Sequence, residues 1–137
     1  MQEGLSQLSV MAIHQDMLGR MWFGTEEGVS VYDGVRTITY KPRDFKAQQS
    51  NFIGNKTEFI AGDNNGDIFF NSDNALIRYD IRRQEFSCIR DANVHAVCSN
   101  KGTVWVSIAD SIYTWDSGQN KLIFAFQLEN ENQHATW

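Results

Sequence analysis

Gly19-Arg20-Met21-Trp22-Phe23, followed by Val31-Tyr32-Asp33, occurs in two further versions later in the chain. In every version an aromatic residue stands three positions after the glycine. An aspartate stands fourteen positions after the same glycine and directly follows a second aromatic residue. Three copies at fixed spacing indicate a structural repeat. The repeated positions are Gly19, Trp22, Tyr32 and Asp33; Gly66, Phe69, Tyr79 and Asp80; and Gly102, Trp105, Trp115 and Asp116.

The residues around each glycine predict four short strands per repeat. An alternating apolar run precedes each glycine, a second and a third strand follow it, and a fourth apolar run comes after the closing aspartate. Apolar residues do not recur at helical spacing, so the pattern favours antiparallel strands. Such a unit is typical of a propeller blade. We therefore predict an all-β, partial β-propeller of about three four-stranded antiparallel blades, spanning 1–137, with blades at approximately 4–43, 53–90 and 93–128.

Repeat spacing, composition and charge further narrow the kinds of protein that this sequence can encode. Successive glycines are 47 and then 36 residues apart, and the excess falls around 44–50, a polar stretch that could form one helical turn. The chain has 137 residues, with 42% hydrophobic residues and a net charge of −5, which is the profile of a folded domain without a nucleic-acid face. It has no apolar run long enough to span a bilayer, and Met1–Gly4 has neither the basic region nor the apolar core of a secretory signal.

The first repeat resembles the two-component regulator propeller repeat. The resemblance rests on Gly4-Leu5-Ser6, Ser9-Val10, Gln15-Asp16, Gly19, Met21-Trp22-Phe23-Gly24-Thr25, Gly28-Val29 and Tyr32-Asp33-Gly34. It implies the periplasmic sensor region of a Bacteroidetes hybrid two-component system, in which glycan fragments control transcription of polysaccharide-utilisation genes. It also implies a non-enzymatic segment, because the membrane helix, histidine kinase and DNA-binding regulator of such proteins are separate parts. The resemblance therefore predicts a piece of a longer protein or a divergent short relative.

Polar residues in the turns between the second and third strands are the candidate ligand-binding residues. Their oxygen atoms could hydrogen-bond sugar hydroxyls, but turns favour the same residue types for conformational reasons, so both interpretations stay open. An oligo- or polysaccharide is the ligand that we expect, and the sequence suggests no catalytic residue, metal ligand or cofactor. The candidates are Glu26, Glu27, Asp73, Asn74 and Asp110.

The remaining motifs favour structural roles. The mid-strand aromatics Trp22, Phe69 and Trp105 are expected to pack between neighbouring blades, and the closing aspartates to cap the turns that follow them. Cys88 and Cys98 fall on strands too far apart for a disulfide, so we predict two free, largely buried thiols.

Two other functions remain alternatives. A propeller enzyme, such as a lyase or a glycoside-cleaving domain, would need a cluster of histidines or carboxylates on one face. A structural blade module would bind protein instead of sugar. Because closed propellers have about four to eight blades, we also predict that self-association or the remaining blades of a larger ring cover the flanks of a three-blade array.

Overall fold

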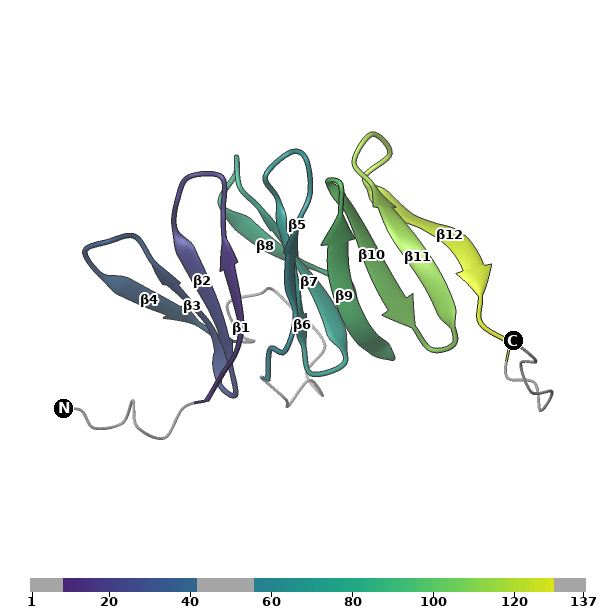
Figure 1. Ribbon diagram of the computed structural model, residues 1–137, viewed down its shortest axis with the longest axis horizontal. Helices are drawn as coiled ribbons and strands as arrows, with labels where there is room; N and C mark the ends of the chain where they lie inside the picture. Colours follow the sequence, from purple (N-terminus) through teal and green to yellow (C-terminus); the bar gives the residue numbers. More distant parts are fainter. Residues whose placement is uncertain (1–8, 42–55, 130–137) are drawn as a thin grey trace, which may run out of the picture.

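The computed structural model describes residues 9–41 and 56–129, and this part of the chain is all-β (Figure 1). The strands form three four-stranded antiparallel sheets, each in simple sequential order, which confirms the predicted fold class. We call them blades 1, 2 and 3. Blade 1 contains β1 (Val10–Gln15), β2 (Met21–Thr25), β3 (Gly28–Tyr32) and β4 (Thr37–Tyr40); blade 2 contains β5 (Ile60–Gly62), β6 (Ile68–Ser72), β7 (Ala75–Asp80) and β8 (Glu85–Arg90); blade 3 contains β9 (Val94–Asn100), β10 (Thr103–Ile108), β11 (Ser111–Asp116) and β12 (Lys121–Gln127).

The three blades stand side by side with their first strands adjacent (Figure 1). β5 contacts both β1 and β9, so the first strands lie on the inner side of the array and the fourth strands on the outer side. The stretch 44–50, predicted to include a helical turn, lies outside the described residues. Within the described ranges no helix has the length and apolar character needed to cross a membrane.

The repeated glycines occupy the turns between the first and second strands. Gly19, Gly66 and Gly102 all have φ between +82° and +88°, a region that residues with a Cβ rarely adopt. In blade 1 the carboxylate of Asp16 also holds this turn, because it accepts hydrogen bonds from the backbone N–H groups of Leu18 and Arg20. The turn geometry therefore accounts for the first position of the repeat.

The repeated aspartates cap the turns between the third and fourth strands. The Oδ1 atom of Asp33 accepts the N–H groups of Val35 and Arg36, at 2.9 and 3.0 Å. Asp80 and Asp116 each accept two backbone N–H groups at the same offsets, two and three residues on. These side-chain bonds fix the hairpin turn that follows each closing aspartate.

Aromatic side chains from one blade pack against the next blade. Trp22 is 1% exposed, and its ring centroid lies 5.0 Å from that of Tyr79 and 6.3 Å from that of Phe70 in blade 2. Phe69 is fully buried and lies 5.1 Å from Trp115 in blade 3. Two apolar clusters result, one at each boundary between blades.

Trp105 corrects the expectation that all three mid-strand aromatics pack between blades. Its strand buries Val104 and Val106 against blade 2, so the alternation of β10 directs Trp105 to the opposite face. No described blade covers that face, and Trp105 is only half-buried.

The cysteines are free, as predicted, but they are not largely buried. Cys98 pairs with Trp105 across the β9–β10 ladder and is exposed on the same uncovered face. Cys88 is half-buried near the outer side of blade 2, where its thiol lies 3.5 Å from the carbonyl oxygen of Arg90. Desolvation, with a smaller contribution from the charge of Asp91, raises the pKa of the Cys88 thiol.

Candidate functional site

The five candidate residues lie in the turns β2–β3, β6–β7 and β10–β11. These turns occupy the same end of the three blades, along the lower side of Figure 1. We call this end the turn edge, defined by Glu26, Glu27, Asp73, Asn74 and Asp110. The fold thus places the candidates on one edge of the array, at three successive blades.

In blade 1, Thr25 organises the turn. Its hydroxyl oxygen accepts the N–H of Glu27 at 3.0 Å and its hydroxyl donates to the carbonyl oxygen of Gly28 at 3.0 Å. Glu26 and Glu27 are exposed, and the Glu27 carboxylate lies 3.9 Å from the ammonium group of Lys41. An exposed ion pair at this distance contributes little to stability. Because the Glu27 side chain is exposed, its carboxylate oxygens are accessible to a ligand.

In blade 2, the turn is tied to the chain that leads into the blade. Asp73 has φ of +50°, donates its N–H to the carbonyl oxygen of Lys56 at 2.8 Å, and accepts the Lys56 N–H through Oδ1 at 3.2 Å. The carbonyl oxygen of Asn74 accepts the N–H of Val94 at 3.0 Å, while its side chain is exposed. Asp73 therefore stabilises the turn through its bonds to Lys56, whereas the side-chain amide of Asn74 is exposed to solvent.

In blade 3, Asp110 is exposed and bound to its own blade. Its Oδ2 atom accepts a hydrogen bond from Nε2 of Gln127 at 2.8 Å, and Oδ1 lies 3.2 Å from the hydroxyl of Ser111. The hydrogen bond from Gln127 is the main reason that the pKa of Asp110 lies below its usual value. This carboxylate is thus ionised at neutral pH and remains an acceptor.

Chemically, the turn edge offers carboxylate and amide oxygens held by short local bonds. Such a surface can accept hydrogen bonds from hydroxyl or amino groups. The same local bonds also explain these residues as turn-formers, so the geometry alone does not separate the two interpretations of the sequence. Among the described residues, no group of three or more His, Cys, Asp or Glu side chains is arranged to hold a metal ion.

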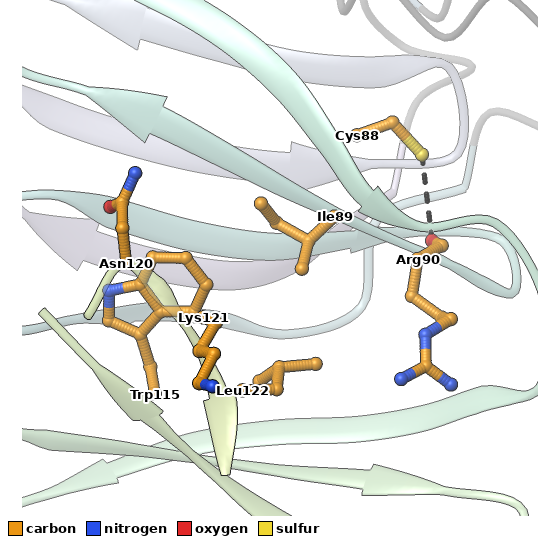
Figure 2. Close-up of a pocket in the computed structure, with 7 residues that line it drawn as sticks. All are labelled: Cys88, Ile89, Arg90, Trp115, Asn120, Lys121 and Leu122. Atoms are coloured by element: carbon orange, nitrogen blue, oxygen red, sulfur yellow. Dashed lines mark hydrogen bonds between the residues drawn. The ribbon is translucent and has the colours of Figure 1, made fainter.

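A groove between blades 2 and 3 was not anticipated from the sequence (Figure 2). It has a volume of about 390 Å³ and runs between the outer strand of blade 2 and the last two strands of blade 3. Its lining combines apolar and cationic side chains: Cys88, Ile89, Arg90, Trp115, Asn120, Lys121 and Leu122. The indole N–H of Trp115 is buried and has no hydrogen-bond partner in the described structure.

A similar groove of about 430 Å³ lies between blades 1 and 2, beside Tyr79 and Phe86. Tyr79 and Trp115 hold the same position in their repeats, directly before the closing aspartate. Both grooves therefore sit where the outer strands of successive blades diverge. Because a groove occurs at both boundaries, we interpret the presence of a groove as a consequence of how the blades pack and not as the mark of a binding site of one particular blade.

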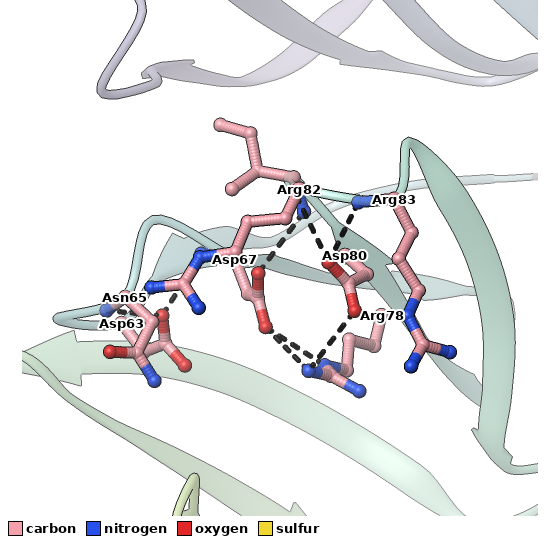
Figure 3. Close-up of polar contacts among 8 residues, drawn as sticks. Asp63, Asn65, Asp67, Arg78, Asp80, Arg82 and Arg83 are labelled. Atoms are coloured by element: carbon pink, nitrogen blue, oxygen red, sulfur yellow. Dashed lines mark hydrogen bonds and ion pairs between the residues drawn. The ribbon is translucent and has the colours of Figure 1, made fainter.

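Charged residues between blades 2 and 3 form a structural network (Figure 3). Asp67 accepts hydrogen bonds from Arg78 through Oδ2, at 2.6 and 3.1 Å, and from the N–H of Ile81 through Oδ1. The guanidinium of Arg78 also lies 3.7 Å from Asp80 and 5.2 Å from the ring centroid of Trp115. Arg78 thus serves packing between the blades and is already paired, which does not favour a catalytic role.

Comparison with known proteins finds one family model and several solved structures to which the chain is similar. The model of the two component regulator propeller family matches residues 4–27. The chain is similar to the extracellular domain of a putative hybrid two component system from B. thetaiotaomicron, at 26% identity over 92% of this chain and 20% of that one, with a TM-score of 0.66. No curated protein sequence matches the chain.

Two further solved structures share the fold. The extracellular domain of a putative one component system from B. thetaiotaomicron aligns at 21% identity over 88% of this chain and 16% of that one, with a TM-score of 0.60. Hydrazine synthase of Kuenenia stuttgartiensis aligns at 13% identity over 87% of this chain and 36% of that one, with a TM-score of 0.58. An enzyme therefore shares the fold, and the fold by itself does not decide whether a chain is catalytic.

The chain spans about a fifth of the length of the hybrid two component system domain that it resembles. The family match begins in the residues that carry the sequence resemblance and ends in the first turn of the turn edge. The propeller architecture continues through blades 2 and 3 in the same register. Residues 4–27 thus match the model of the two component regulator propeller family, and the all-β structure is similar to the extracellular domain of a putative hybrid two component system from B. thetaiotaomicron.

Proposed function

We propose that this chain is a non-enzymatic, extracytoplasmic ligand-sensing propeller segment of a hybrid two-component signalling protein. The observation that carries the proposal is the regulator propeller repeat at residues 4–27, in a chain of which 92% aligns with the extracellular domain of such a system. On this proposal the segment lies in the periplasm, and other parts of the protein transmit the signal.

The ligand that we propose is a glycan fragment, and the response is transcription of polysaccharide-utilisation genes. Sugars present many hydroxyl groups, each of which needs an acceptor when a protein surface takes it from water. The accessible oxygens of Glu27, Asn74 and Asp110 supply such acceptors at three successive blades. Because local hydrogen bonds already order these turns, a ligand would lose little conformational freedom of the protein on binding.

A titration of the 137-residue chain with defined neutral and acidic oligosaccharides, by isothermal calorimetry, tests the proposal. We expect at least one oligosaccharide to bind, and we expect the triple variant Glu27→Ala, Asn74→Ala and Asp110→Ala to weaken it at least about tenfold, which corresponds to about 1.4 kcal/mol. The matched control is Arg83→Ala, an exposed turn residue of blade 2 that belongs to the opposite end of the blade.

Two outcomes would contradict the proposal. Binding of none of the oligosaccharides would remove the glycan as the ligand. Binding that the triple variant leaves unchanged, while a substitution in the inter-blade groove such as Lys121→Ala weakens it, would move the site away from the turn edge.

A further inference from the structure

The grooves at the two boundaries between blades are lined by the same positions of the repeat. In each groove the later blade supplies the aromatic residue directly before the closing aspartate and the residues four, five and six positions after that aspartate. A groove is therefore a property of the packing, whereas the side chains that line it differ. The four residues are Tyr79, Gln84, Glu85 and Phe86 between blades 1 and 2, and Trp115, Asn120, Lys121 and Leu122 between blades 2 and 3.

The charge of the lining differs between the two grooves. The first groove contains Glu85 and Arg20, and the guanidinium of Arg20 lies 2.8 Å from the Asp16 carboxylate. The second contains Lys121 at the position of Glu85, and Arg90 from β8 on the opposite wall. Neither Lys121 nor Arg90 forms an ion pair with another residue of the described chain. The second groove thus presents two cations that have no anionic partner among the described residues.

Blade 3 also orients the cation that blade 2 supplies. The guanidinium carbon of Arg90 lies 5.6 Å from the ring centroid of Tyr113, a distance at which a cation is attracted to an aromatic ring. In Figure 2 the cationic ends of Arg90 and Lys121 both extend toward the lower side of the view. Two strands from different blades therefore direct positive charge to one groove.

The aromatic residue of this groove carries a polar group without a partner. Trp115 is 6% exposed, and the Phe69 ring centroid and the Arg78 guanidinium carbon lie 5.1 and 5.2 Å from its ring centroid. Its indole N–H is buried and meets no acceptor in the described structure, whereas the indole N–H of Trp22 donates to Asp16. A buried donor that has lost water without gaining an acceptor is unfavourable. An acceptor that reaches this nitrogen would therefore bind favourably.

Asn120 lies beside this nitrogen and controls access to it. Figure 2 shows the Asn120 side chain next to the indole nitrogen of Trp115, and both residues line the groove. Asn120 is exposed, and its side chain makes no hydrogen bond to another described residue. Rotation of this side chain costs no internal hydrogen bond and opens a path for a ligand atom to the indole N–H.

We propose that the groove between blades 2 and 3 binds a small organic acid, in which a six-membered ring carries a carboxylate and a hydroxyl group. The carboxylate lies between Arg90 and Lys121, because charge-assisted hydrogen bonds are stronger than neutral ones. The ring offers a flat apolar face to Ile89 and Leu122, and a hydroxyl oxygen accepts the N–H of Trp115. The groove volume of about 390 Å³ lies within the range of small-molecule pockets.

A titration of the ¹⁵N-labelled 137-residue chain, followed by NMR, tests the proposal with D-galacturonate and 3-hydroxybenzoate. The two probes share the carboxylate, the ring and the hydroxyl group, and they distinguish a sugar acid from an aromatic acid. We expect at least one of them to shift the indole ¹H–¹⁵N signal of Trp115, assigned with Trp115→Phe, at or below about 20 mM. The Trp22 indole signal should stay in place because that N–H already has an acceptor. Galactose, which lacks the carboxylate, should leave the Trp115 signal in place.

Substitutions at exposed positions separate the groove from other sites without threatening the fold. The double variant Arg90→Gln and Lys121→Gln should weaken binding at least about tenfold, because it removes both charges. Lys121→Glu, which introduces the charge that Glu85 has in the other groove, should abolish binding. Lys56→Gln is the matched control, since it removes an exposed cation beside the turn edge, and it should bind as the wild type does. Added salt should weaken binding by screening the charges.

Three results would overturn the proposal. Neither acid shifts the Trp115 signal, or the double variant leaves the shift unchanged, or the acids no longer bind when Glu27, Asn74 and Asp110 are replaced by alanine. Binding of one acid alone supports the proposal and identifies the kind of ring. The inference does not rest on glycan binding at the turn edge, whose carboxylates would repel an acid, so neutral oligosaccharides test the turn edge and small acids test the groove.

Discussion

Trp22 and Trp105 hold the same position in their repeats but lie in different environments. Trp22 is buried against Tyr79 of the next blade, and its indole N–H donates to Oδ2 of Asp16 at 2.8 Å. Trp105 lies on the last face of the array, which no described blade covers. The repeat therefore specifies which face a side chain points to, and the next blade determines whether that side chain becomes part of a core.

This difference shows how stability is distributed along the chain. In a repeat array the stability is approximately a sum of terms within units and terms between neighbours. Blade 2 has neighbours on both sides and its second strand is buried throughout, from Ile68 to Ser72. Blades 1 and 3 each have one face that a described blade covers and one face that no described blade covers, so we expect equivalent substitutions to cost different amounts of stability in different blades.

The largest effect should come from removing the covered aromatic. Trp22→Ala should lower the free energy of unfolding by about 3–5 kcal/mol, because a large buried side chain leaves a cavity between blades 1 and 2. Trp105→Ala should lower it by less, about 1–2 kcal/mol in dilute solution, because no described blade packs on that side chain and part of it already contacts water. Urea unfolding curves of both variants measure the two losses in free energy of unfolding, and similar losses at the two positions would contradict this prediction.

A smaller effect should follow the loss of the Asp16 carboxylate charge, which lies within hydrogen-bond distance of the Trp22 indole. Both carboxylate oxygens of Asp16 are occupied, Oδ1 by two backbone N–H groups and Oδ2 by Nε of Arg20 and Nε1 of Trp22. Burial by itself would raise the pKa of Asp16, but the hydrogen bonds from Trp22 and Arg20 outweigh it and lower that pKa. Asp16→Asn places an amide N–H₂ against two donors and should cost about 2 kcal/mol at pH 7.

The pH dependence of this cost has a definite sign. A carboxylate whose pKa is lower in the folded than in the unfolded state stabilises the fold above its unfolded pKa, about 3.9 for Asp. That contribution is lost as the pH falls through the lower, folded pKa. The difference between wild type and Asp16→Asn should thus shrink below about pH 4, and a difference that is constant from pH 7 to pH 3 would contradict this account.

The smallest effect should occur at Asp63, the equivalent residue of blade 2. Its Oδ1 atom accepts the N–H groups of Asn65 and Asp67, but its Oδ2 atom is buried without a partner. Desolvation is the main cause that raises the pKa of Asp63, and the charge of Asp67 adds to it. Asp63→Asn keeps the Oδ1 acceptor and removes the unfavourable charge.

We therefore expect Asp63→Asn to be neutral or to stabilise the fold by up to about 1 kcal/mol at pH 7. Because the pKa is raised in the folded state, the penalty in the wild type is present above that pKa and disappears below the unfolded value. Any gain from the substitution should then vanish in acid. Thermal unfolding at pH 7 and at about pH 3, below the unfolded pKa, measures it, and a loss as large as that of Asp16→Asn would show that the two turns do not differ.

The sequence predicts most of the fold because the repeat fixes the turns and the strand directions together. Gly19, Gly66 and Gly102 mark turns that need a positive φ, and the closing aspartates mark the next turns. In the second of these turns Asn65, which precedes Gly66, does not have a positive φ, so the glycine alone takes that conformation.

The environments of single side chains were harder to predict, because each depends on what lies across a boundary. Trp105 and Cys98 were expected to be buried, and both lie on a face that the next blade would have to cover. The bonds of Asp67 to Arg78 join residues eleven positions apart and follow from strand register, which a pattern of residue types does not specify. The candidate ligand residues share an edge by symmetry of the repeat, and their role stays a prediction.

Hydrogen exchange of the indole N–H groups tests the central claim most directly, that an aromatic of this position is buried only where a next blade follows. The ¹H–¹⁵N signals of Trp22 and Trp105, assigned with single Trp→Phe variants, are followed in a sample dilute enough to be monomeric. We predict that the Trp22 indole exchanges on the order of a hundredfold more slowly than that of Trp105, because its exchange requires the blades to separate. Equal protection of the two indoles in the monomer would contradict the account.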